Sequence, residues 1–197
     1  MTNRLAKLIL LFVLSITLII GYSDDNNDKK NNYVAECIDI DGNVYETVTI
    51  GSQVWMAENL KTTHYRDGTP IPTGFSNSEW GNLDDTETGA YCEYGNNPAN
   101  VATYGRLYNW YAVDDPRGLA PEGWHVPTDD ELKQLEMFLG MSLAEADDTE
   151  WRGTNEGSKL AGRADLWNNG ALEEDPEFGT SGFTLLPGGY RNYRGNY

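Results

Sequence analysis

The chain has 197 residues and is strongly acidic, with 31 acidic and 14 basic residues and a formal net charge of −17. A surface this acidic is repelled by phosphate backbones, which excludes nucleic-acid-binding proteins. The length favours one domain with extensions.

The first 21 residues have the pattern of an export signal. Arg4 and Lys7 precede an apolar run over residues 8–20, which is short for a membrane span of about 20 residues but suits a signal peptide. Its removal takes away two basic residues and no acidic one, leaving 12 basic and 31 acidic residues and a net charge of −19. We expect an exported protein at the outer membrane, at the cell surface or outside the cell. The alternative is an uncleaved N-terminus, through which alone the chain would reach a membrane.

Residues 22–36 form a polar spacer that cannot pack a core. The run LIIGYSDD resembles a bacterial lipoprotein signal, but Tyr22 stands where such signals have the lipidated cysteine. The acidic tract after it resembles the surface-export tracts of lipoproteins from the Bacteroidetes group. We expect the domain itself to occupy residues 37–197.

Residues 44–50 alternate between apolar and polar side chains, which predicts a half-buried strand, and residues 54–57 continue as a second strand after a turn. The preceding DIDGN run (39–43) begins like a calcium loop. An EF-hand loop needs an acidic ligand at its twelfth place, where this chain has Ile50, so the run favours a hairpin turn at residues 41–43 instead. Residues 61–100 are too long for a featureless loop and predict an ordered excursion held by its aromatic residues.

Two helices are expected next. Leu107, Trp110 and Tyr111 have helical spacing within residues 104–113. A short strand around Trp124 then leads into a helix over 128–140, in which Thr128 and the glutamate three residues on make a capping box. The core stripe of this second helix consists of Leu132, Leu135, Phe138 and Leu139. Another capping box at 142–145 predicts a short helix, and residues 182–191 predict a buried strand before a glycine turn.

Cys37 and Cys92 are the two cysteines. After export they can form one disulfide, which would stabilise the fold by about 4 kcal/mol through loop entropy. Two separate buried thiols are the alternative.

Four segments together resemble the Fibrobacter succinogenes major paralogous domain. They are GNVYETVTIGSQVWMAENL (42–60), YGRLYNWYAV (104–113), GWHVPTDDEL (123–132) and GFTLLPGGYRN (182–192). The third also resembles the G-W-x-L-P-T-x-x-E-W run of formylglycine-generating enzymes. The resemblance implies an α+β, C-type-lectin-like fold with two main helices, small antiparallel sheets and long loops. The family continues beyond the last segment, and many members carry a cysteine where this chain has Ala120, so we expect this fold to lack its last strands.

Catalysis has little support in the sequence. No residue matches the cysteines and copper site of the formylglycine enzymes, and His64 and His125 are too far apart in sequence to suggest a zinc site. We therefore expect both histidines to be structural or solvated, and we expect neither enzymatic activity nor a resident metal.

Binding has more support, because aromatic rings among Asn, Asp and Gly residues can stack on sugar rings. The ligand-binding candidates are Trp80, Tyr91, Tyr94, Trp151 and Trp167. The alternative is that these rings hold long loops in place. A weaker hypothesis is a calcium ion held by Asp165 and the acidic residues 173–175. We expect a non-catalytic interaction module for a glycan or another surface protein. The competing reading is a structural or spacer domain without a small ligand, and a formylglycine-type enzyme is the remotest alternative.

Overall fold

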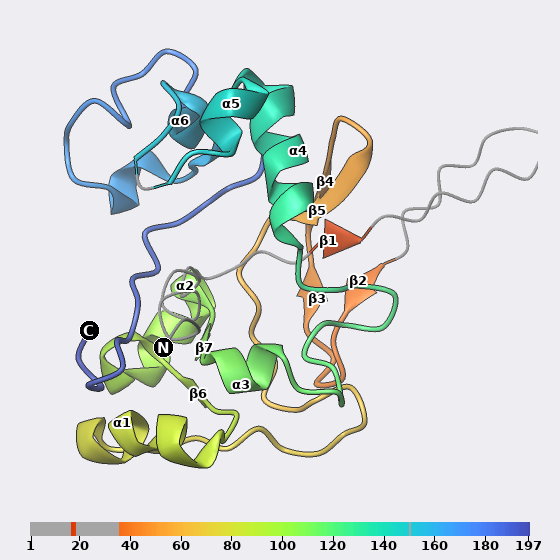
Figure 1. Cartoon of the computed structure of the whole chain (residues 1–197), viewed down its shortest axis with the longest axis vertical. Coiled ribbons are helices and arrows are strands. Elements are labelled where there is room, and N and C mark those ends of the chain that lie inside the picture. Colours follow the sequence, from red (N-terminus) through yellow and green to blue (C-terminus); the bar gives the residue numbers. More distant parts are fainter. Residues whose placement is uncertain (1–16, 19–35, 150) are drawn as a thin grey trace, which may run out of the picture.

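The structure is a computed structural model that describes residues 17–18, 36–149 and 151–197 (Figure 1). Small antiparallel sheets and mostly short helices are joined by long loops, which confirms the expected α+β class. Within the described part, no helix has the length and apolarity that a membrane crossing requires.

The central sheet has the order β1-β5-β4. β4 (Thr47–Ile50) and β5 (Gln53–Met56) form the expected hairpin, in which Val48 lies opposite Trp55. β1 (Thr17–Leu18) pairs antiparallel with β5, although it lies in the expected export signal. The remainder of residues 1–35, including most of that signal and the spacer, lies outside the described residues.

Two further sheets have two strands each. β2 (Cys37–Ile38) pairs with β3 (Val44–Tyr45), so the strand expected over 44–50 is divided between two sheets. β6 (Tyr91–Cys92) pairs with β7 (Leu107–Tyr108). The strand expected over 182–191 is reduced to an isolated bridge between Leu185 and Ala161.

The two longest helices are α1 (Asn77–Thr86) and α4 (Asp129–Leu139). The shorter ones are α2 (Val101–Tyr104), α3 (Trp110–Val113), α5 (Leu143–Ala146) and α6 (Glu156–Leu160), with 3-10 turns at Tyr94–Asn96, Pro98–Asn100 and Ala164–Leu166. The prediction of one continuous helix over residues 104–113 is therefore wrong. The Leu107 backbone pairs with Cys92 instead, and the Asn109 side chain starts α3 by accepting a hydrogen bond from Ala112 N.

α4 begins and ends where the sequence predicts. Thr128 Oγ1 accepts from Glu131 N at 3.3 Å, and Thr128 N donates to Glu131 Oε2 at 2.8 Å, which completes the capping box. Leu135 is buried as expected. Phe138 was expected in the core but is 63% exposed. Its ring covers the β4–β5 turn, where a Cβ on Gly51 would approach it to 2.9 Å.

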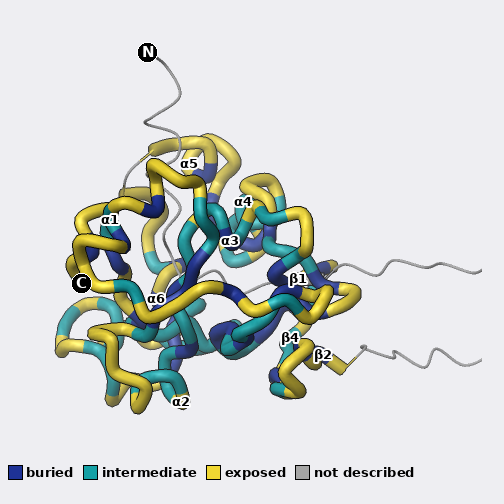
Figure 2. The backbone as a smooth tube through the Cα atoms, turned by 90° about the horizontal axis from the view of Figure 1, so that it is seen from below, coloured by how far each residue is buried: buried dark blue, intermediate teal, exposed yellow. Residues whose placement is uncertain are grey.

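The core consists of three clusters (Figure 2, dark blue). The first contains Tyr45, Met56, Tyr65 and Trp124; the second contains Trp80, Leu83, Cys92 and Leu107; the third contains Ile50, Trp55, Leu135 and Phe183. After Leu185 the chain runs from the α4 end of the molecule to α1 (Figure 1), where Arg191 becomes a buried side chain beside Trp80.

Candidate functional site

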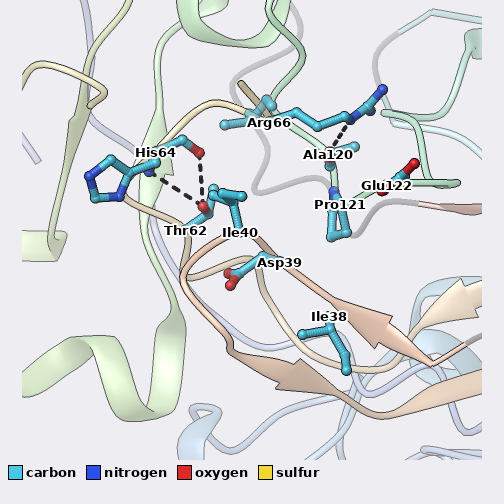
Figure 3. Close-up of a pocket in the computed structure, with 10 residues that line it drawn as sticks. Ile38, Asp39, Ile40, Thr62, His64, Arg66, Ala120, Pro121 and Glu122 are labelled. Carbon is cyan, nitrogen blue, oxygen red and sulfur yellow. Dashed lines mark hydrogen bonds between the residues drawn. The ribbon is translucent and has the colours of Figure 1, made fainter. Parts of the chain in front are cut away.

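A small cavity lies between the β2–β3 hairpin, residues 62–66 and residues 119–122 (Figure 3). Its volume is about 160 Å³. We call it the hairpin pocket. It is lined by Ile38, Asp39, Ile40, Thr62, His64, Arg66, Leu119, Ala120, Pro121 and Glu122.

Asp39 organises the hairpin from inside. Its Oδ1 accepts from Asp41 N at 3.0 Å and Asn43 N at 2.9 Å, and its Oδ2 accepts from the Tyr45 hydroxyl at 2.5 Å. The β2–β3 pairing on either side of this run confirms the hairpin turn expected at residues 41–43. The carboxylate is 6% exposed and engaged by donors of its own chain, whereas the flanking Ile38 and Ile40 are 40% and 53% exposed. The turn therefore presents an aliphatic surface to the pocket.

His64 is held by an acidic neighbour. Its Nδ1 lies 2.5 Å from Asp41 Oδ1, and Asp41 Oδ2 accepts from Thr63 N and Thr63 Oγ1. Burial alone would raise the pKa of Asp41, but hydrogen bonds from Thr63 and His64 outweigh it and hold that pKa below its usual value. With Asp41 ionised, His64 Nδ1 is the donor of this bond, and Nε2 is the nitrogen left for another group.

Arg66 is oriented by backbone carbonyls. Nε donates to Ala120 O and Nη2 donates to Trp124 O, each at 3.1 Å. The guanidinium lies over Gly118, where a Cβ would stand 3.2 Å from Arg66 Cζ, and the positive φ of +79° at this position also favours glycine. Arg66 forms no ion pair with any described residue. Its charge is available at the rim, on the same side as Glu122 (Figure 3).

The structure separates the aromatic residues that the sequence proposes as ligand contacts. Trp80 and Tyr91 are 6% and 8% exposed and belong to the core, so their assignment to a surface site is corrected. Trp80 is a buried residue of α1 with the Arg191 guanidinium over its ring, and Tyr91 is a residue of β6, so both rings belong to the packed interior of the fold. Trp167 is half-buried and donates from Nε1 to Gly162 O at 2.8 Å.

Tyr94 and Trp151 remain available, at 39% and 101% exposure. The Tyr94 ring meets Tyr197 edge-on with centroids 5.4 Å apart. Neither Tyr94 nor Trp151 lines the hairpin pocket. The aromatic candidates are thus not gathered into one site.

The cysteines do not pair. Cys37 lies in the first core cluster and Cys92 in the second, and both are free, buried thiols. The expected disulfide is corrected to the alternative of two separate thiols. Burial raises the pKa of Cys37 to about 12.

Metal ligands are likewise dispersed. No group of three or more His, Cys, Asp or Glu side chains among the described residues is arranged to hold a metal ion. His125 Nε2 lies 2.9 Å from Oε1 of Glu131, the capping glutamate of α4, which agrees with the structural role expected for this histidine. Asp165 is paired with Arg163 at 2.8 Å, so one oxygen ligand of the calcium hypothesis is already engaged.

Sequence reasoning missed the pocket itself. The alternation of Ile38 and Ile40 with the acidic residues of the turn is the one sequence pattern that points to the aliphatic wall, and it is a weak one. No sequence pattern marks Arg66 or residues 119–122 as part of a pocket.

A family model described as the Fibrobacter succinogenes major domain matches residues 48–197. The chain belongs to this family. Most of the hairpin pocket lies within this Fibrobacter succinogenes major domain, and Ile38, Asp39 and Ile40 precede the matched range. No curated protein and no solved structure matches the chain, so the C-type-lectin-like architecture stays a prediction.

Proposed function

We propose that this domain is an exported, non-catalytic interaction module that binds a glycan in the hairpin pocket. The observation that carries the proposal is the division of the pocket into an aliphatic wall and a polar rim. Ile38, Ile40 and Pro121 supply the wall, and His64 and Arg66 supply hydrogen-bonding groups.

A sugar ring has the matching chemistry. Its C–H faces are apolar and its hydroxyl edges donate and accept hydrogen bonds, so it fits a site with apolar walls and a few placed polar groups. The cavity of about 160 Å³ is smaller than pockets for drug-sized ligands, which supports recognition of one ring or chain end rather than a long segment. The exposed rings of Tyr94 and Trp151 lie outside this pocket and would act only as separate contacts for a longer glycan.

The Asp41–His64 pair also suggests a second candidate, a hydrolytic site, because a carboxylate that orients a histidine is part of catalytic triads. Such a site needs a nucleophile beside the histidine. The hydroxyl that lines the pocket belongs to Thr62, which is fully buried and donates to His64 O at 2.9 Å. This engagement favours binding over hydrolysis.

A structural or spacer domain is the third candidate. Burial of Trp55, Trp80 and Trp124 agrees with it, since these rings stabilise the fold. The cavity between Ile38, Ile40 and Pro121 favours a binding module, because a spacer does not need a concave site with polar groups at its edge.

The test is a glycan screen with the full chain, recovered after export, followed by calorimetry on any sugar that binds. Ile40→Ser removes part of the pocket wall. Val44→Ser is the matched control, because Val44 is an exposed aliphatic residue of the same hairpin that does not line the pocket. We expect binding to be lost in the first variant and kept in the second. Binding by no glycan, or equal loss in both variants, would contradict the proposal.

A further inference from the structure

We propose that the hairpin pocket selects an acidic sugar, a uronic acid residue, whose carboxylate pairs with Arg66. The inference rests on the glycan binding proposed above and adds the charge of the ligand. It follows from how this one cation is placed in a strongly acidic chain.

Arg66 differs from most cationic side chains of the domain because no described carboxylate pairs with it. Seven other described cationic side chains are paired with carboxylates: Lys61, Arg106, Arg117, Lys133, Arg152, Lys159 and Arg163. Of the remaining described arginines, Arg191 is buried against Trp80, and Arg194 lies over the Tyr193 ring at 5.2 Å. Arg66 is exposed at a cavity and has neither a carboxylate nor a ring among the described residues. In a chain with a net charge of −17, a cation left this way is suited to an external anion.

The guanidinium is also held in place before any ligand arrives. Two backbone carbonyls fix Nε and Nη2, and Arg66 N donates to Gly118 O at 2.8 Å. Nη1 makes no hydrogen bond with the described residues and is the nitrogen left for a ligand oxygen. A fixed side chain loses little conformational entropy on binding, which strengthens recognition. Nη1 can donate a charge-assisted hydrogen bond to a carboxylate oxygen, which is shorter and stronger than a bond between neutral groups.

The other pocket groups fit the rest of a uronic acid. Ile38, Ile40 and Pro121 can cover the C–H face of the ring, and His64 Nε2 can bond a hydroxyl. Asp39 lines the pocket and Asp41 contacts the lining residue His64, but donors of the chain already engage both carboxylates.

Glu122 is the opposing charge on the rim. It is exposed and lies on the same side as Arg66 (Figure 3), so it weakens the attraction of an anion while offering an acceptor to a hydroxyl. A single cation beside this carboxylate suits a monoanion such as a uronate better than a phosphate, which carries up to two charges.

The experiment compares charged and neutral forms of the same sugar. The methyl glycosides of glucuronate and galacturonate are titrated into the full chain by calorimetry, alongside those of glucose and galactose. Acetate and an N-acetyl amino acid supply a carboxylate without a sugar ring. Arg66→Gln is the test variant, and Arg194→Gln is the matched control because Arg194 is also exposed and pairs with no carboxylate of the described residues.

We expect one uronide to bind at least about tenfold more tightly than its neutral counterpart, as charge-assisted hydrogen bonds imply. Arg66→Gln should abolish this preference, Arg194→Gln should keep it, and Glu122→Gln should increase it. Equal binding of uronide and neutral sugar, unchanged in Arg66→Gln, would overturn the charge selection and leave glycan binding standing. Binding of acetate or the amino acid as tight as the uronide would overturn the sugar assignment. Binding of none of these compounds would overturn the uronate proposal, and only binding by no glycan in the screen would overturn glycan binding as well.

Discussion

Replacing Arg191 with alanine should destabilise the domain by about 3 kcal/mol. The side chain is 1% exposed and lies 4.4 Å from the Trp80 ring centre and 5.1 Å from that of Tyr197. It donates to Gly195 O, Phe75 O and Asn77 Oδ1 at 3.0–3.1 Å. It thus joins the last residues of the chain to α1.

The magnitude follows from these contacts. Hydrogen bonds from a charged donor are worth about 1.5–3 kcal/mol each, and a desolvated cation–π contact adds about 2 kcal/mol. With three such hydrogen bonds, the gross loss is therefore about 6.5–11 kcal/mol. Alanine also removes the cost of burying a guanidinium, which is several kcal/mol and is increased here because Nη1 has no partner among the described residues. The difference leaves about 3 kcal/mol, which corresponds to a fall in Tm of about 6–12 °C for a domain of this size.

The assay is urea denaturation of the full chain, followed by tryptophan fluorescence. Arg194→Ala is the control, because Arg194 is exposed and its loss should change stability by less than about 0.5 kcal/mol. A loss of less than 1 kcal/mol in Arg191→Ala, close to that of the control, would refute the reasoning that Arg191 anchors this segment.

Three further predictions concern stability and the thiols. Thr128→Ala removes the α4 cap and should cost about 1 kcal/mol in urea denaturation, and an unchanged midpoint would show that the cap is dispensable. The pKa of Asp41 is lowered on folding, so its contribution to stability should be complete above its unfolded-state pKa of about 4 and be lost as the pH falls through the lower folded-state value. Asp41→Asn should therefore flatten acid unfolding below pH 4, whereas the exposed Asp85→Asn should not; parallel acid-unfolding curves for all three proteins would be the contrary result. Cys37 and Cys92 should resist a thiol reagent until the chain unfolds and then both react, while rapid labelling of the native protein or a reducible cross-link found by mass spectrometry would contradict the two buried thiols.

Local signals explain what the sequence predicts correctly. α4 is specified by a capping box and by Leu135 at helical spacing, all within a dozen residues, so no distant contact is needed to recognise it. The β4–β5 hairpin is similar, because alternation and a glycine turn are both local.

Distant contacts explain what the sequence hides. α1 has a capping box at Ser76 and Glu79, but only Trp80 and Leu83 are buried along it, so it lacks the periodic stripe that marks a helix. The spacing of residues 104–113 is helical, yet pairing of Leu107 with Cys92 overrides it.

The hairpin pocket is the feature that is hardest to predict from the sequence, because three segments far apart in the chain meet there. The position of Arg66 depends on carbonyls more than fifty residues away, at Ala120 and Trp124. No local pattern contains that information. The aromatic residues were proposed as ligand contacts because of their residue type. The burial of Trp80 and Tyr91, however, also depends on packing against residues far away in the sequence.

NMR titration of the full chain with the methyl glycoside of a uronic acid would show whether a uronate binds in the hairpin pocket. We expect saturable shifts of the Arg66 Nε–H signal and of the methyl groups of Ile38 and Ile40, because all three residues line the pocket. Saturable shifts confined to the exposed Tyr94 or Trp151 rings, with the Arg66 signal unmoved, would contradict it.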